Sequence, residues 1–222
     1  MALKRIQPGV RFSGIKVAPD EMDMVRQYIV YSPSVSGTWF GTAAAGTSTQ
    51  AKPLVILGAV ADYPRNLLGI VAGSSDMGGV WVVNGKNQFG ETIQETITIG
   101  TAANGATVAG TKIFAEVTSG TFTFTTGAVG SGTPTLGVAI GTAANLVAQF
   151  GLPDKIGAVS DVKAIIWSDS DTNKSVNGGT VTSTYVGTAN HTFNVGQIIA
   201  TADSLIVRYK STYSSEETVN KL

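Results

Sequence analysis

Residues 80–125, VWVVNGKNQFGETIQETITIGTAANGATVAGTKIFAEVTSGTFTFT, decide the fold class of this chain. Within residues 92–99 the isoleucines share one parity, and threonine and glutamine occupy the other; the isoleucines are Ile93, Ile97 and Ile99. Phe122 and Phe124 alternate with threonines in the same way. A period of two is typical of a strand with one buried face. The stretch therefore predicts antiparallel β-structure with a threonine-rich outer face.

This outer face carries very little charge. Residues 91–150 hold only four charged side chains, which are Glu91, Glu95, Lys112 and Glu116. In the whole chain 14% of residues are charged, against about a quarter in ordinary soluble domains. A sheet with so few charges favours contact with other protein copies over a solvated surface, so we expect a structural or assembly role. Because Glu95 has the parity of the isoleucines, it is expected to point inward, at a barrel rim or a subunit contact.

The overall balance of charge excludes several partners and cofactors. Fifteen basic residues cancel fifteen acidic ones, so no net field attracts nucleic acid or an anionic membrane. We expect no membrane partner and no specific nucleic acid partner. The chain has no cysteine, which excludes disulfides and cysteine zinc sites. The start MALKRIQPGV lacks the apolar core of a secretory signal, so a cytoplasmic product is expected.

Short apolar or alternating runs fill the region from residue 53 onward. They are separated by turn-forming pairs such as Asn84-Gly85 and Ser119-Gly120, which we expect to close hairpins. Residues 142–150 are expected to form one helical turn. The pattern predicts an all-β body over residues 53–222, folded as an antiparallel β-sandwich of jelly-roll type or as a barrel.

Residues 1–52 have a different composition and are expected to form an extended N-terminal arm and linker. Four basic residues lie in the first sixteen: Lys4, Arg5, Arg11 and Lys16. Residues 19–31 fit a short helix, and a strand fits equally well from Arg26 onward. The small residues at positions 42–52 predict a linker. Trp39-Phe40 is a candidate exposed aromatic pair that anchors a partner, with core packing as the alternative.

Catalytic and metal-binding patterns are weak. His191 is the only histidine, and no nucleophile motif accompanies it. Asp169, Asp171 and Asn173 match the first half of a calcium loop, but Lys174 stands where the glycine is required. A solvated loop fits these residues better. We predict no catalytic residue, no metal site and no cofactor, and we expect the protein not to be an enzyme.

Four segments follow one another in an order that resembles a known family. They are AVADYPRNLLGIVAG from residue 59, NGKNQFGETIQETITI from residue 84, VAGTKIFAEVTSGTF from residue 108 and TLGVAIGTAANLVAQFGLPDKI from residue 135. Residues 59–156 resemble a β-sandwich family of tailed-bacteriophage virion proteins, which includes capsid decoration and other auxiliary components. The resemblance implies a turn or capping role for Asn66 and Gly85, and a core role for Phe114 and Leu152.

The resemblance implies a virion structural protein that decorates or cements the capsid exterior. Its partners would be the major capsid protein and copies of itself, most simply as a homotrimer. In this interpretation the basic arm and the Trp39-Phe40 pair contact the capsid, and the threonine-rich sheet packs against sister subunits. The alternatives are a tail, collar or head-to-tail component and a particle-displayed carbohydrate-binding module, whose exposed aromatic platform would use Trp39 or Trp81.

Overall fold

The computed structural model describes residues 24–31, 33–72, 77–102, 106–125, 132–139, 148–154, 162–169, 174–176, 192–195 and 204–211. These residues are all-β, with strands and no helix, as the sequence predicts. The strands are β1 (Met24–Tyr31), β2 (Gly41–Ala43), β3 (Ala51–Ile56), β4 (Val60–Ala72), β5 (Met77–Lys86), β6 (Thr92–Ala102), β7 (Ala106–Phe124), β8 (Thr133–Val138), β9 (Ala148–Gly151), β10 (Val162–Asp169), β11 (Lys174–Val176), β12 (Thr192–Val195) and β13 (Ser204–Ser211).

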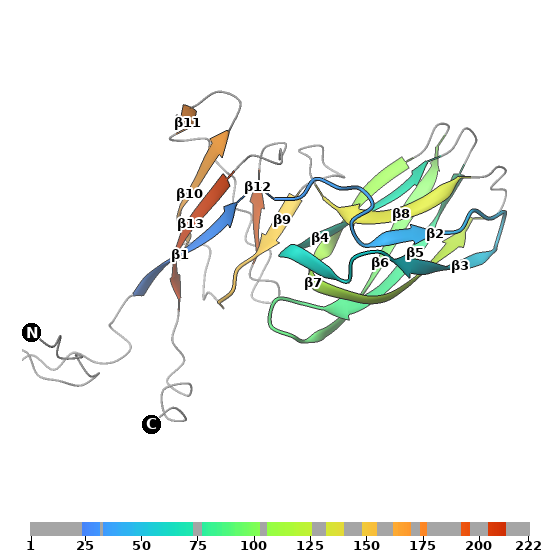
Figure 1. Ribbon diagram of the computed structural model, residues 1–222, viewed down its shortest axis with the longest axis horizontal. Coiled ribbons are helices and arrows are strands. Elements are labelled where there is room, and N and C mark those ends of the chain that lie inside the picture. Colours follow the sequence, from blue (N-terminus) through green and yellow to red (C-terminus); the bar gives the residue numbers. More distant parts are fainter. Residues whose placement is uncertain are drawn as a thin grey trace, which may run out of the picture.

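Five antiparallel strands close into a barrel. Each strand pairs with the next in the order β4, β8, β2, β3 and β7, and β7 pairs with β4 again to complete the ring. Two strands extend the sheet beyond β7, namely β5 and β6, while β9 and β12 extend it beyond β4 (Figure 1). Closure therefore pairs each of the five barrel strands on both sides, and the additional strands continue the sheet on either side of the ring.

The long strand β7 makes this closure possible. Its first part pairs with β4, from Ala106 to Glu116, and its last part pairs with β3 at Thr121 to Thr123. Because the strand continues through Ser119 and Gly120, the predicted hairpin at that pair is wrong. Gly120 serves close packing instead, since a Cβ there would lie 3.2 Å from the side chain of Leu54.

The hairpin predicted at Asn84-Gly85 is also displaced. Both residues lie inside β5, and the chain turns at residues 87–90, where Gly90 adopts a φ of 79°. A Cβ at Gly85 would lie 2.0 Å from the carbonyl oxygen of Glu116, so this glycine permits close contact between strands. The turn role that the family resemblance implied for Gly85 is therefore corrected.

The barrel core confirms the alternation read from the sequence. Ile97 and Ile99 are buried, whereas Thr92, Thr96 and Thr98 are exposed. Phe122 packs edge-on against Trp81 at 5.1 Å between ring centroids and against Phe124 at 4.9 Å. The other fully buried members of this cluster include Phe40, Leu67, Val71, Val83, Phe114, Val117, Leu136 and Val138.

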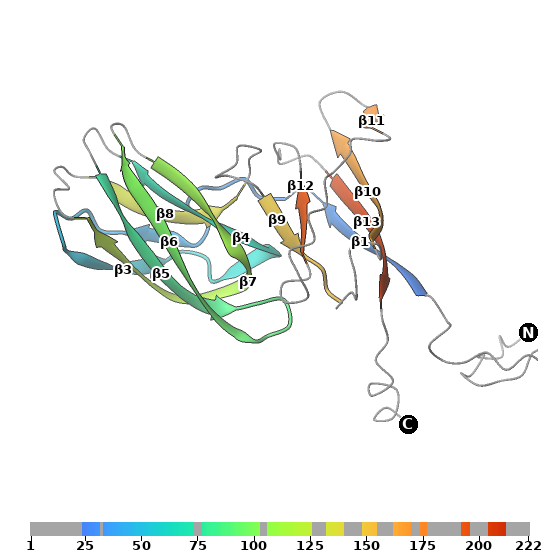
Figure 2. The same cartoon turned by 180° about the vertical axis from the view of Figure 1, so that it is seen from behind.

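A second sheet of four strands, in the order β1, β13, β10 and β11, stands beside the barrel at its β9 end (Figures 1 and 2). Its buried face contributes Val30, Leu205 and Val207 to a second apolar cluster. From the barrel side, this cluster receives Phe150 and Leu152. The core roles implied for Leu152 and, in the barrel, for Phe114 are confirmed.

This arrangement corrects the expected N-terminal organisation. Residues 24–31 form strand β1, so the helical alternative is wrong for that part, and the strand expected from Arg26 is confirmed. The linker expected at 42–52 contains most of β2 and the start of β3, and the predicted boundary at residue 53 falls inside β3. Small, uncharged residues suit closely spaced strands as well as loops, which explains the error. Residues 148–150 are likewise strand, not helix.

Candidate functional site

The segments that carry the family resemblance meet at Asn66 on β4. Its side chain is fully buried, and its Nδ2 donates to the carbonyl oxygen of Gly110 on β7 at 2.8 Å. Its Oδ1 accepts the backbone N–H of Gln149 on β9, also at 2.8 Å. One amide side chain thus joins three strands from the middle of β4. The turn or capping role expected for Asn66 is wrong. The prediction failed because sequence spacing does not show that a buried amide side chain can bridge strands.

A bulge in β7 lies next to Asn66. Asn66 pairs with Ile113 and Leu68 pairs with Ala109, so residues 110–112 of β7 oppose a single residue of β4. A bulge of this kind leaves backbone N–H groups without a partner in the ladder. The strand therefore needs an acceptor from another part of the fold.

Glu95 on β6 supplies that acceptor. Its Oε1 accepts the backbone N–H of Thr111 at 2.6 Å and that of Lys112 at 3.1 Å, as well as the Thr111 hydroxyl at 3.2 Å. Lys112 Nζ donates to the carbonyl oxygen of Gln94 at 2.7 Å, which adds a second link between the strands. Glu95 does point inward, as its parity predicts, and its partner is a strand of its own chain.

Burial makes the charge of Glu95 costly. The carboxylate is 6% exposed, and its Oε2 has no hydrogen-bond partner among the described residues. Desolvation raises the pKa of Glu95, and the hydrogen bonds from Thr111 and Lys112 oppose that shift in part. A carboxyl whose folded-state pKa is raised stabilises the fold below its unfolded pKa, and this contribution is lost as the pH rises through the folded-state pKa.

We therefore expect Glu95→Gln to remove one source of pH dependence. The variant keeps an oxygen for the bulge and cannot ionise, so wild type should lose stability relative to the variant as the pH rises from 4 to 7. Each unit of pKa difference corresponds to about 1.4 kcal/mol. Urea unfolding at several pH values measures the difference, with Glu91→Gln on the exposed hairpin as the control. Parallel curves for wild type and Glu95→Gln would contradict the expectation.

Arg65, next to Asn66, lies buried between the barrel and the second sheet. Its Nη2 donates to the carbonyl oxygens of Ser34 at 2.6 Å and Ala139 at 3.3 Å. Its guanidinium carbon lies 5.1 Å from the ring centroid of Phe150, and Nη1 lies 3.6 Å from Asp62 Oδ2. Burial lowers the pKa of Arg65 to about 10, against the effect of Asp62. The guanidinium is used to position backbone segments.

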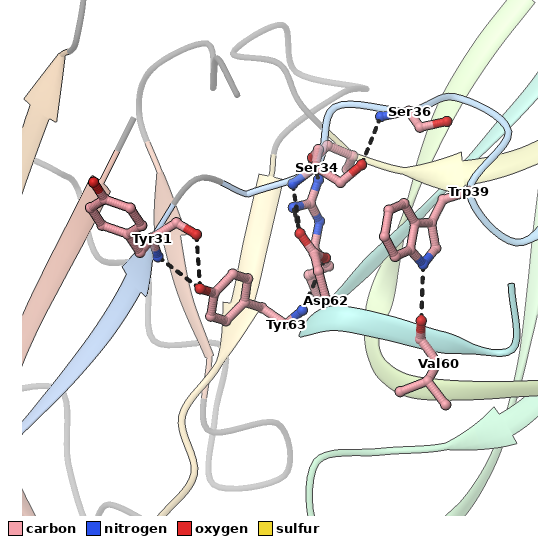
Figure 3. Close-up of polar contacts among 9 residues, drawn as sticks. Tyr31, Ser34, Ser36, Trp39, Val60, Asp62 and Tyr63 are labelled. Atoms are coloured by element: carbon pink, nitrogen blue, oxygen red, sulfur yellow. Dashed lines mark hydrogen bonds and ion pairs between the residues drawn. The ribbon is translucent and has the colours of Figure 1, made fainter. Parts of the chain in front are cut away.

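The preceding residues fasten β1 to the barrel (Figure 3). Asp62 Oδ2 accepts the backbone N–H of Ser34 at 2.6 Å. The Tyr63 hydroxyl accepts the N–H of Tyr31 at 2.9 Å and donates to the carbonyl oxygen of the same residue at 2.8 Å. The sequence DYPRN therefore uses four of its five side chains to hold neighbouring backbone segments in place.

Asp154, which follows the GLP segment, makes a second fastening. Its carboxylate accepts a hydrogen bond from Arg26 Nη1 on β1 at 2.7 Å and another from the Tyr209 hydroxyl on β13. Burial, together with the Asp154 carboxylate, raises the pKa of Tyr209. The turn thus joins β1 and β13, two neighbouring strands of the second sheet, to the end of β9.

The aromatic anchor expected from the sequence is corrected in part. Phe40 is fully buried in the barrel core, so it cannot present its ring to a partner. Trp39 is half-buried, and its Nε1 donates to the carbonyl oxygen of Val60 at 3.0 Å (Figure 3). Trp81 is fully buried, which removes it as an exposed platform for carbohydrate.

Other predicted site residues fall outside the described ranges. These are Lys4, Arg5, Arg11, Lys16, Asp171, Asn173 and His191. Within those ranges, no group of three or more His, Asp or Glu side chains could hold a metal ion. The described residues also include no helix with the length and hydropathy needed to span a bilayer.

The sequence reading missed one surface. Four large apolar side chains near the β3–β4 connection are strongly exposed, and we call them the apolar ridge: Val55 at 58%, Ile56 at 37%, Leu57 at 67% and Val60 at 64%. They belong to PLVILGAVA, residues 53–61, nine consecutive residues without a polar side chain. Such a run normally predicts a buried strand, so the sequence signal was present but pointed to the core.

The geometry thus separates a buried network, which organises the fold, from an apolar ridge, which is exposed. Comparisons of the chain with protein-family models, with curated proteins and with solved structures find no match.

Proposed function

We propose that this protein is a structural component of a tailed-bacteriophage virion that decorates or cements the capsid exterior as an oligomer. The observation that supports the proposal most is that the motif residues make structural contacts within the fold. Asn66, Glu95 and Gly110 make contacts between strands, and Arg65 holds the backbone that follows β1. Residues that carry the family resemblance are therefore engaged in holding a rigid scaffold, which suits a protein whose task is mechanical.

The composition supports the same role. A capsid presents many identical sites, so an oligomer that binds several of them gains avidity even when each contact is weak. Such binding requires shape and rigidity more than chemistry. The threonine-rich, weakly charged outer faces of β6 and β7 fit close approach to other protein surfaces.

The capsid contacts are proposed to come from the N-terminal basic residues, which are Lys4, Arg5, Arg11 and Lys16. Their positive charge suits an acidic protein surface. Trp39 adds a half-buried aromatic side chain beside the apolar ridge. The major capsid protein is the proposed partner.

The test uses capsids assembled without this protein. Added wild-type protein should co-sediment with them, saturate at a fixed number of copies per capsid and give density on the outer surface in electron micrographs. Changing the four basic residues to glutamate should weaken binding by at least about tenfold, since each favourable contact contributes on the order of 1 kcal/mol. Arg208→Glu, an exposed arginine on β13, is the control.

Two outcomes would contradict the proposal. One is the absence of any binding to empty capsids. The other is a ring of sixfold or twelvefold symmetry at the tail or head-to-tail junction, which would assign the protein to that structure instead.

A further inference from the structure

The apolar ridge is unusual because it is both exposed and rigid. The backbone N–H of Leu57 donates to the carbonyl oxygen of Phe40 at 2.9 Å, and that of Val117 donates to the carbonyl oxygen of Ala59 at 2.7 Å. Val55 and Ile56 are paired with β2, and the Trp39 indole holds Val60. The backbone that carries these side chains is therefore held in place, and little backbone conformational entropy is lost when they are covered.

The apolar character of the ridge fits the centre of a protein interface. Monomeric proteins rarely expose contiguous apolar patches larger than a few hundred Å² without a function for them. A stable interface buries about 800 Å² on each partner, with an apolar core and a polar rim. Four large, strongly exposed aliphatic side chains supply the core of such an interface, and the rest comes from their surroundings.

Charges around the ridge favour a second copy of the same chain as its partner. Residues 53–61 carry no charge, so two ridges can meet without burying one. At the margin, Val60 pairs with Glu116, which forms an ion pair with Lys86 at 2.9 Å. Lys52 and Asp62 flank the apolar run on its two sides. The Glu116–Lys86 pair thus brings both signs of charge to the rim of each copy, which a symmetric assembly can match, whereas a partner with a strong charge of one sign would find no complement.

We infer that the apolar ridge is the surface through which copies of this chain associate. The inference refines the oligomer of the proposed function, on which it rests for its biological purpose. Subunit contact is thereby assigned to the apolar ridge and no longer to the threonine-rich face. That face is polar and offers no comparable apolar core, since its exposed residues on β6 are Thr92, Gln94, Thr96 and Thr98.

Sedimentation equilibrium of the full chain tests the inference directly. Wild type should associate between about 1 and 100 µM, the range of weak to moderate affinities. Leu57→Asp should raise the dissociation constant at least about 30-fold, as expected for a buried interface anchor. Thr98→Asp places the same charge on the outer face of β6 and should leave association unchanged. Circular dichroism and urea unfolding establish that each variant is folded, and Leu57→Gln replaces Leu57→Asp if the latter is not.

The outcomes distinguish this inference from the proposed function. A wild-type protein that is monomeric at 100 µM, or variants of Leu57 that still associate, would overturn the inference. So would a monomer whose ridge binds capsids or lipid vesicles, because the occupant would then be of another kind. An oligomer that depends on Leu57 but does not bind capsids would leave the inference in place and remove the proposed function.

Discussion

Trp81→Ala is expected to lower the free energy of unfolding by about 3–5 kcal/mol, the range for removing a large aromatic side chain from a packed core. Trp81 is fully buried and packs edge-on against Phe122, which in turn packs against Phe124. Alanine at this position would leave a cavity and remove the first of these ring contacts. Since β5, which carries Trp81, pairs with both β6 and β7, the loss affects three strands at once.

Urea unfolding monitored by circular dichroism measures this effect, with the midpoint and slope compared between variants. Trp81→Phe should cost less than half as much, because it keeps an aromatic ring and removes an indole N–H that has no partner among the described residues. Trp39→Ala, at a half-buried tryptophan, is the matched control, with an expected cost of about 1–2 kcal/mol. Equal costs at positions 39 and 81 would show that the barrel core is not organised around Trp81.

Asn66→Asp is expected to destabilise the fold by at least about 3 kcal/mol at pH 7, although it changes almost no volume. The amide Nδ2 that donates to Gly110 would become a carboxylate oxygen facing the same carbonyl oxygen. The variant would therefore bury a negative charge and lose a hydrogen bond. The contact that Oδ1 makes with the N–H of Gln149 would survive.

The pH dependence of this variant gives a second, independent check. Burial disfavours the charged form, so the folded-state pKa of the new carboxyl would lie above its unfolded value. Its folded state would bind more protons, and stability would fall as the pH rises from about 4. Acid should therefore rescue Asn66→Asp, since a protonated carboxyl can donate to Gly110.

Asn84→Asp is the control for Asn66→Asp. Asn84 makes the same kinds of side-chain hydrogen bond, to Ser119 and Gln94, but it does so near the surface. Its replacement should cost no more than about 0.5 kcal/mol and show no acid rescue. If the two variants behaved alike, Asn66 would not be the buried link between three strands that we describe.

Local periodicity predicted the strands well. The alternation in β6 and the Phe122 and Phe124 pattern in β7 predicted the buried face correctly, because a half-buried strand alternates apolar and polar residues in the sequence. The turns were read less well. Asn84-Gly85 and Ser119-Gly120 are turn-forming pairs by intrinsic preference, yet both lie in strands. Glycine is needed at positions 85 and 120 for close contact between strands, and a single sequence does not distinguish this use from a turn.

The network and the ridge were beyond sequence reasoning for a related cause. Asn66, Glu95 and Gly110 come together only through strand pairings between distant segments, and no spacing rule connects them. PLVILGAVA has the composition of a core strand, and only the three-dimensional position of the β3–β4 connection reveals that it is exposed. For both the network and the ridge, the position of the segments in the folded chain determines the role of the residues, and the local sequence does not.

The pairing of β1 with β13 has a consequence for biosynthesis. Met24 pairs with Ser211 and Tyr31 pairs with Ser204, so the second sheet joins segments from opposite ends of the described chain. The strands of the closed barrel lie between residues 41 and 138, and that barrel can form while later residues are still being translated. β1 has to wait until residues 204–211 are translated before its partner exists. Completion of the second sheet is therefore a late folding step, which follows the closure of the barrel.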